Sequence, residues 1–303
     1  MDMIVKNKLL AHYRNGNTTV SIFEDGTKIR EYEDIPTPYF PESLDIKITN
    51  YCDMGCKFCH ESSTVKGKHA DLEKLKEVLI SLPAGVELAI GGGNPLDHPD
   101  LLEFLIWCQF KGLICNITVN QMHLKKHFAT IETLLEEDLI KGLGISINGD
   151  DFEKIKELKS LSNNIVYHVI AGVHDISILD TLNELDNCKV LILGYKTFGR
   201  GGLYLNSKVT ENILKWKNNL KPYLGKFLIS FDNLALEQLN VESMIDPERW
   251  NQCYMGDDFT FTMYIDAVEQ KYAPTSRSDK RISFNKMSLF EYFINYRNVH
   301  TIS

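Results

Sequence analysis

Residues 44–60 read LDIKITNYCDMGCKFCH, and this stretch decides the fold. Its first part, Leu44–Thr49, reads as an apolar β-strand. The strand leads directly into a loop that carries Cys52, Cys56 and Cys59. The sequence therefore predicts a strand whose carboxyl end presents three thiols.

Downstream, short apolar segments of strand type alternate with longer amphipathic segments of helix type. The predicted strands are Leu44–Thr49, Val86–Ile90, Ile114–Val119, Gly142–Ile147, Ile165–Ile170 and Val190–Leu193, with Phe227–Phe231 as a further candidate. The predicted helices are Ala70–Leu82, Pro99–Lys111, Thr130–Leu139, Asp151–Leu161 and Ile176–Leu185. Such a series implies an α/β fold with a parallel sheet, and repetition without a reversal favours a barrel or partial barrel. Chemistry in these barrels lies at the carboxyl ends of the strands.

Two appendages flank this region. Asp25-Gly26 between two apolar runs predicts a β-hairpin, and prolines then form a linker. After residue 233 the alternation stops, and Phe259–Ile265, Lys271–Ala273 and Met287–Tyr296 predict two strands and a helix. We therefore expect three regions: an N-terminal hairpin and linker (1–43), a barrel (44–233) and a small α+β tail (234–303).

Composition narrows the class of protein. The chain has 303 residues, of which 44% are hydrophobic, and a formal net charge of −8. A negative surface disfavours nucleic-acid binding, and no apolar run approaches the length of a membrane helix. Residues 1–10 also lack the apolar core of a secretory signal, so we expect a cytoplasmic protein. In that compartment the seven cysteines are expected to be reduced, and a cluster of them to bind a metal.

The three closely spaced cysteines suit an iron–sulfur cluster. Thiolates select Fe–S clusters, zinc or Cu(I). Three of them on one loop cap three corners of a cubane, whereas structural zinc takes four ligands. His60 is the candidate for a fourth zinc ligand, but it directly follows Cys59, and adjacent residues rarely reach one tetrahedral ion. A zinc site and an incidental group of cysteines remain as alternatives.

The pattern Cys-x3-Cys-x-Phe-Cys, formed by Cys52, Cys56, Phe58 and Cys59, resembles the signature of the radical S-adenosylmethionine (SAM) superfamily. The resemblance covers roughly residues 44–232 and implies a partial (β/α)6 barrel. It also implies that the three thiolates hold a [4Fe–4S] cluster whose open iron chelates SAM, with Phe58 on the adenine side. SAM would be cleaved reductively to a 5′-deoxyadenosyl radical that abstracts hydrogen from a substrate.

A glycine run at the end of the second predicted strand supports the resemblance. Glycines allow a ligand to approach the backbone closely. The family has a Gly-Gly-Glu-Pro-like segment here that receives the SAM amino group, and this chain has Asn94 in place of the acid. The resemblance implies a SAM site at Gly91, Gly92, Gly93, Asn94 and Pro95. Taken alone, the run would be a glycine-rich turn.

Weaker signals lie at the ends of later strands. Ser146 and Asn148 share one face of a strand and are candidates for contact with the SAM ribose, or they merely close the strand. His168 is a candidate for the barrel interior, although a lone strand histidine is more often structural. The loop at residues 194–202 combines glycines with Arg200 and is either a cradle for the adenine or a carboxylate, or a flexible loop.

The tail resembles the opening of a SPASM/twitch domain, from Arg249 to Asp266. Such tails supply cysteines for auxiliary clusters, but Cys253 is the sole cysteine after residue 188. One cysteine cannot hold a cubane, so we expect a tail without an auxiliary cluster. Cys253 is then a hydrogen-atom donor or, as we favour, a buried thiol.

The tail resemblance favours a peptide or protein side chain as substrate. Alternatives are a small molecule or nucleotide, activation of a glycyl-radical enzyme, and a non-enzymatic zinc-binding module. The expected cofactors are a [4Fe–4S] cluster and SAM, and the expected partner is an external one-electron reductant of flavodoxin or ferredoxin type. The catalytic residues beyond the cofactor ligands are unknown from sequence. The hairpin region is a candidate docking surface but is short for a winged-helix peptide-recognition module.

Overall fold

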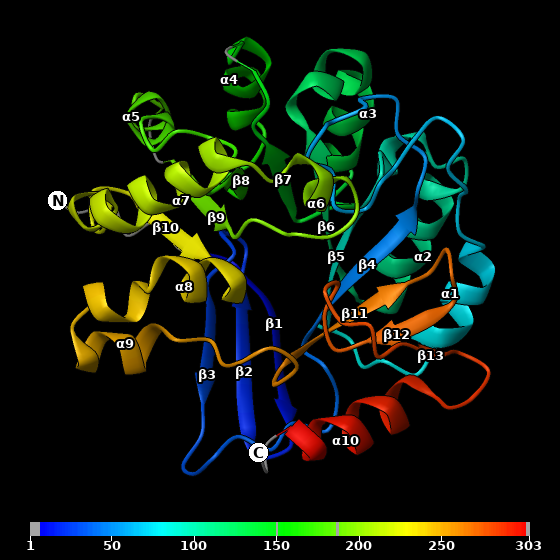
Figure 1. Ribbon diagram of the computed structural model, residues 1–303. Helices are drawn as coiled ribbons and strands as arrows, with labels where there is room; N and C mark the ends of the chain where they lie inside the picture. Colours follow the sequence, from blue (N-terminus) through cyan, green and yellow to red (C-terminus); the bar gives the residue numbers. More distant parts are fainter. Residues whose placement is uncertain (1–6, 150, 186–187, 301–303) are drawn as a thin grey trace, which may run out of the picture.

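A computed structural model describes residues 7–149, 151–185 and 188–300. The fold is mixed α/β and is built on a ten-stranded, mostly parallel sheet (Figure 1). Its strand order is β10-β9-β8-β7-β6-β5-β4-β11-β12-β13, and in the described chain no strand pairing joins the two ends. The seven strands of the parallel series are β4 (Ser43–Thr49), β5 (Glu87–Gly92), β6 (Ile114–Asn120), β7 (Gly142–Ser146), β8 (Ile165–Ile170), β9 (Lys189–Leu193) and β10 (Leu228–Phe231).

Every strand predicted between residues 44 and 231 is present, with ends that differ by at most two residues. Apolar side chains on alternate positions, such as Leu88 and Ile90, are fully buried, whereas Glu87 and Ala89 between them are half-buried. The apolar set faces the helices. The other set forms what we call the inner face of the sheet.

Five helices follow successive strands and lie around the outside of the sheet in Figure 1. They are α1 (Leu72–Leu79), α2 (Leu101–Lys111), α3 (Leu124–Glu136), α4 (Glu153–Lys159) and α5 (Ile178–Asn183). Asp71 caps α1 by accepting hydrogen bonds from the Glu73 and Lys74 amides. The predicted start of α3 at Thr130 is wrong: Asn120 caps a short 3-10 turn that runs straight into the helix at Leu124.

Four further helices were not expected from the sequence. They are α6 (Arg200–Tyr204), α7 (Ser207–Asn219), α8 (Asn233–Leu239) and α9 (Pro247–Cys253). Two of them give a weak apolar signal: α9 buries no residue, and the buried face of α7 includes the polar Asn212. A hydrophobic period therefore cannot reveal these elements well.

The C-terminal residues extend the main sheet. Strand β11 (Thr262–Asp266) lies parallel to β4, with Ile265 opposite Ile46. It begins later than predicted because Phe259 has a left-handed backbone (φ +66°) and ends the preceding loop. The remaining elements are β12 (Lys271–Ala273), β13 (Ile282–Ser283) and α10 (Leu289–His300).

The N-terminal segment forms a separate antiparallel sheet of β1 (Leu9–Asn15), β2 (Thr18–Phe23) and β3 (Lys28–Glu31), drawn in blue in Figure 1. The predicted hairpin is β2–β3, and residues 1–6 of the predicted region lie outside the described residues. This sheet contacts the amino ends of the parallel strands. Its contacts are Arg30 with Glu42 before β4, Lys28 with Glu87 in β5, Val20 and Ile22 with Ile114 in β6, and the Asp25 carbonyl with Lys189 in β9.

One large apolar cluster joins the sheet to the surrounding helices. Among the helices of the described ranges, none is both long and apolar enough to cross a bilayer.

Candidate functional site

The cysteine loop begins at the carboxyl end of β4. The β1–β3 sheet lies at the other end of the parallel strands, against their amino ends. Cys52, Cys56 and Cys59 are half-buried and form no disulfide. The loop folds back on itself, because the Cys52 amide donates to the Thr64 carbonyl at 3.0 Å and the Thr64 amide donates to the Asn50 carbonyl at 3.1 Å. The three cysteines thus lie on one folded loop beyond the end of β4.

Arg200, at the start of α6, fastens this loop from a distant part of the chain. Its Nε donates to the Cys56 carbonyl at 2.9 Å, and its Nη1 donates to the Ser63 carbonyl at 2.8 Å. Its backbone amide donates to the Cys59 carbonyl at 3.1 Å. At this point the loop at residues 194–202 binds the cysteine loop, and its role as a cradle for the adenine or a carboxylate stays a prediction. The sequence identified Arg200 as a cation in this loop, but it did not indicate that Arg200 binds carbonyls of the cysteine loop.

The surroundings of the thiols suit a metal–sulfur group. Burial is the main cause that raises the pKa of the Cys52 and Cys56 thiols, so bound metal rather than water would stabilise their thiolates. The side-chain amides of Asn120 and Asn148 lie 4.0 and 3.9 Å from Cys56 Sγ and donate to it. Amide donors to sulfur are the environment that tunes iron–sulfur clusters.

The glycine run packs directly against the cysteine loop. A Cβ at Gly92 would lie 2.4 Å from the Thr49 carbonyl oxygen, and one at Gly93 would lie 2.0 Å from that of Tyr51. The amides of Gly93 and Asn94 donate to these same two oxygens at 2.7 Å. These two amides therefore already donate to backbone oxygens of the cysteine loop and are not free to bind a ligand. Gly91 differs, since a Cβ there would have no atom within 4 Å, and it borders open space.

Asn94 and Pro95 lie beneath this surface and are buried. The Asn94 side-chain nitrogen donates to Asp97 Oδ2 at 2.7 Å, while its oxygen has no hydrogen-bond partner. An unpaired, buried acceptor is the group that an ammonium donor would satisfy. A SAM contact at Asn94 therefore stays a prediction.

The other predicted SAM residues lie on two sides of the loop. Phe58 lines a small cavity of about 40 Å³ with Ile170 and Leu193, at the ends of β8 and β9. Ser146 ends β7, half-buried, and pairs in register with His168 of β8. Phe58 and Ser146 thus border the carboxyl end of the sheet, and Asn148 reaches Cys56 itself.

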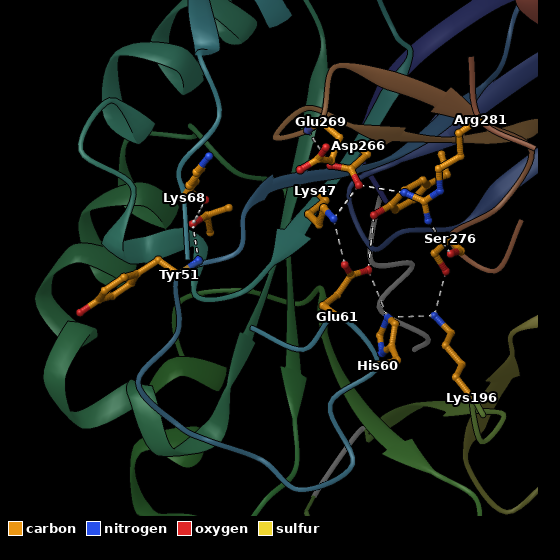
Figure 2. Close-up of polar contacts among 12 residues, drawn as sticks. Lys47, Tyr51, His60, Glu61, Lys68, Lys196, Asp266, Glu269, Ser276 and Arg281 are labelled. Atoms are coloured by element: carbon orange, nitrogen blue, oxygen red, sulfur yellow. Dashed lines mark hydrogen bonds and ion pairs between the residues drawn. The ribbon is translucent and has the colours of Figure 1, made fainter. Parts of the chain in front are cut away.

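A buried polar network links the cysteine loop to the C-terminal strands (Figure 2). Lys47 Nζ lies 3.2 Å from Glu61 Oε2 and 2.6 Å from Asp266 Oδ2. Glu61 accepts from Tyr264, and Asp266 also pairs with Arg281 at 2.8 Å. The cation of Lys47 therefore joins the residue two positions after Cys59 to the end of β11. Sequence reasoning missed this network entirely.

His60 belongs to the same network and not to the thiols. Its Nε2 lies 3.4 Å from Glu61 Oε1 and 3.3 Å from Lys196 Nζ, which in turn donates to Ser276 (Figure 2). The argument against His60 as a zinc ligand agrees with this placement. A different set of ligand atoms, on Cys52, Asp53 and His123, lies within 4.8 Å of one another, and a 2.7 Å hydrogen bond between Asp53 and His123 accounts for their proximity.

The remaining cysteines are distant from this chemistry. Cys108, Cys115 and Cys188 are buried, whereas Cys253 is exposed. The favoured prediction of a buried thiol at Cys253 is wrong, because the residue ends α9, a short surface helix with no buried side chain.

Comparison with known proteins agrees with this geometry. Residues 46–189, from β4 to the start of β9, match the model of the Radical SAM superfamily. Among solved structures, SuiB of Streptococcus suis bound to S-adenosylmethionine matches with a TM-score of 0.60 and 15% identity, over 84% of this chain and 66% of that one. SuiB bound to the precursor peptide SuiA matches with a TM-score of 0.58 and 16% identity, over 84% and 65%. The chain thus spans just under two thirds of the length of these structures.

No curated protein sequence matches the chain. At such low identity the structural likeness concerns the fold, whereas the family match spans both the cysteine loop and the glycine run. Residues 46–189 therefore match the Radical SAM superfamily, a family that uses a [4Fe–4S] cluster and S-adenosylmethionine.

Proposed function

We propose that the protein is a radical SAM enzyme that abstracts hydrogen from a peptide or protein side chain, with the cluster held by Cys52, Cys56 and Cys59. The observation that carries the proposal is the half-buried set of three thiols at the end of β4, fastened by Arg200. A cluster held there would supply one electron for the reductive cleavage of SAM to methionine and a 5′-deoxyadenosyl radical. The protein binds and orients the cofactors and the substrate, and it excludes side reactions.

Each neighbouring residue has a part in this arrangement. Asn120 and Asn148 donate toward the Cys56 sulfur and adjust its charge. Gly91 leaves room for SAM, and Gly92 and Gly93 hold the backbone of the glycine run against the cysteine loop. We assign Phe58 to the adenine side, the Asn94–Pro95 segment to the SAM amino group, and Ser146 with Asn148 to the ribose.

The peptide substrate rests on likeness of fold. SuiB, one of the structures with this fold, is described in complex with a precursor peptide. A small molecule or nucleotide is the second candidate. In this proposal the parallel series β4–β9 acts as a partial (β/α)6 barrel, residues 234–303 act as a tail without an auxiliary cluster, and a cytoplasmic flavodoxin or ferredoxin supplies electrons.

The cofactor assignment is tested with Cys56→Ala. We expect the anaerobically purified variant to lose labile sulfide, the brown chromophore and 5′-deoxyadenosine production together. Cys253→Ala, which alters the exposed cysteine, is the matched control and should keep all three. Zinc without labile sulfide in the native protein, or SAM cleavage by Cys56→Ala, would contradict the assignment.

The substrate class is tested by isotope transfer. Candidate peptides and small molecules with deuterated side chains are incubated with the reduced enzyme and SAM. Deuterium in 5′-deoxyadenosine from a peptide supports the proposal. Transfer from small molecules or nucleotides alone would replace it with the second candidate.

A further inference from the structure

Of the three thiols in the cysteine loop, Cys56 receives side-chain amides. The side-chain nitrogens of Asn120 and Asn148 lie 4.0 and 3.9 Å from its sulfur and donate to it. Within the described residues, no side-chain donor reaches the sulfur of Cys52 or Cys59. Asn120 ends β6 and Asn148 follows β7, so two neighbouring strands direct their ends at one sulfur. The surroundings of the three thiols are therefore unequal.

The side chain of Asn120 is oriented by the backbone that follows it. Its oxygen accepts from the Met122 amide at 3.0 Å and caps the short 3-10 turn after β6. The oxygen and nitrogen of a side-chain amide lie on opposite sides of one planar group. Because the oxygen is committed to the turn, the nitrogen is directed away from it and toward Cys56. The cap alone therefore sets the direction of this donor.

Gln121, the next residue along the chain, holds the segment that carries the second donor. Its side chain is buried. Its Oε1 accepts from the backbone amide of Asn148 at 2.9 Å, and its Nε2 donates to the Asp151 carbonyl at 2.5 Å. Met122 packs against the same segment, since a Cβ at Gly149 would lie 3.3 Å from its sulfur. Both ends of the Gln121 side chain thus tie the segment after β7 to the turn after β6.

We propose that Gln121 is a positioning residue that holds the Asn148 amide on Cys56, so that Asn148 and Asn120 together raise the reduction potential of a cluster bound there. The inference rests on the proposed function, because it needs a cluster at the three thiols. Reduction adds one negative charge, part of which lies on the cysteine sulfurs. An N–H group aimed at a sulfur stabilises the reduced form more than the oxidised form, which raises the potential. A higher potential allows a weaker reductant to supply the electron.

The test is an anaerobic redox titration of the holoenzyme without SAM or substrate, followed by the EPR signal of the reduced cluster. Asn148→Leu removes the donor and should lower the equilibrium constant for reduction roughly tenfold, a shift of about 59 mV to lower potential for one electron. Asn148→Ala removes the donor without adding bulk and should shift the potential in the same direction. Gln121→Leu keeps the donor but releases it, and should lower the constant by roughly threefold.

A double-mutant cycle separates positioning from a general loss of structure. Because Gln121 acts through Asn148, adding Gln121→Leu to Asn148→Leu should leave the potential of Asn148→Leu unchanged. Gln238→Leu is the matched control, since Gln238 also bridges a backbone amide and a carbonyl, both of Tyr195. This control should titrate at the native potential.

Iron and labile sulfide per chain are measured in each variant, so that chains with a full cluster are compared. A native potential in Gln121→Leu or in both Asn148 variants, or additive shifts in the cycle, would overturn the inference while the proposed function stands. Failure of the native protein to bind a [4Fe–4S] cluster would overturn both.

Discussion

At the scale of single residues, Arg200 is the side chain on which the cysteine loop most depends. It contributes two side-chain hydrogen bonds to carbonyls of that loop. We expect Arg200→Ala to lower the free energy of unfolding by about 3–6 kcal/mol, since each of the two lost bonds from this charged donor contributes about 1.5–3 kcal/mol. Iron and sulfide content per chain should fall with it. Arg14→Ala is the control, because Arg14 Nε also donates to a carbonyl, that of Gly16, but in the N-terminal sheet. Full cluster content in Arg200→Ala would contradict this role.

His168, on the inner face, should make stability depend on pH. Burial lowers its pKa from 6.5 to about 4, so the folded protein keeps it neutral. Between pH 6.5 and 4 the unfolded chain gains a proton that the folded chain does not, and stability is lost as the pH falls. We expect the free energy of unfolding to drop by about 1–2 kcal/mol more between pH 7 and pH 5 in the native protein than in His168→Gln. His12→Gln, at an exposed position of β1, is the control, and equal losses in all three proteins would exclude His168 as the cause.

At the scale of elements, the end of β5 separates packing from ligand binding within three residues. Gly93→Ala places a Cβ 2.0 Å from the Tyr51 carbonyl oxygen and should cost more than about 3 kcal/mol of stability. Gly91→Ala meets nothing within 4 Å and should leave the melting temperature unchanged, while lowering SAM affinity by roughly tenfold. Calorimetry and equilibrium dialysis with SAM measure the two effects. Unchanged SAM affinity in Gly91→Ala would remove this residue from the proposed site.

The sequence predicted the elements of the sheet well because each strand from β4 to β10 is a short apolar run bounded by turns. It predicted the thiol loop because three ligands fall within eight residues of one strand end. It failed at α7, where the polar Asn212 is buried, and at α9, which buries no residue. It also failed at Arg200 and at the Lys47 network, since their partners come from segments far apart in the sequence. Spacing cannot show which distant charges meet.

At the scale of the molecule, Lys47 joins the C-terminal strands to the catalytic end of the sheet. Lys47→Met leaves Glu61 facing Asp266 without their shared cation, both nearly buried. We expect a loss of about 3 kcal/mol in urea unfolding, as for a broken buried pair. Adding Glu61→Gln to Lys47→Met should recover part of this loss. Lys76→Met is the matched control: Lys76 also bridges two acids, but these are exposed, and the cost should stay below about 1 kcal/mol. Equal costs for the two lysines would contradict the structural role of the network.

The contacts of the N-terminal sheet also constrain the order of folding during synthesis. Its contacts reach Glu42, Glu87, Ile114 and Lys189, so β1–β3 cannot complete its contacts until β9 has been synthesised. The hairpins of β1–β3 are local and form quickly, but they then wait through about 150 residues of translation, which at 5–20 residues per second is on the order of ten seconds. Until β6 has been synthesised, Val20 and Ile22, which are fully buried in the finished protein, have no apolar partner from the main sheet. The segment made before the catalytic domain is thus among the last to reach its place.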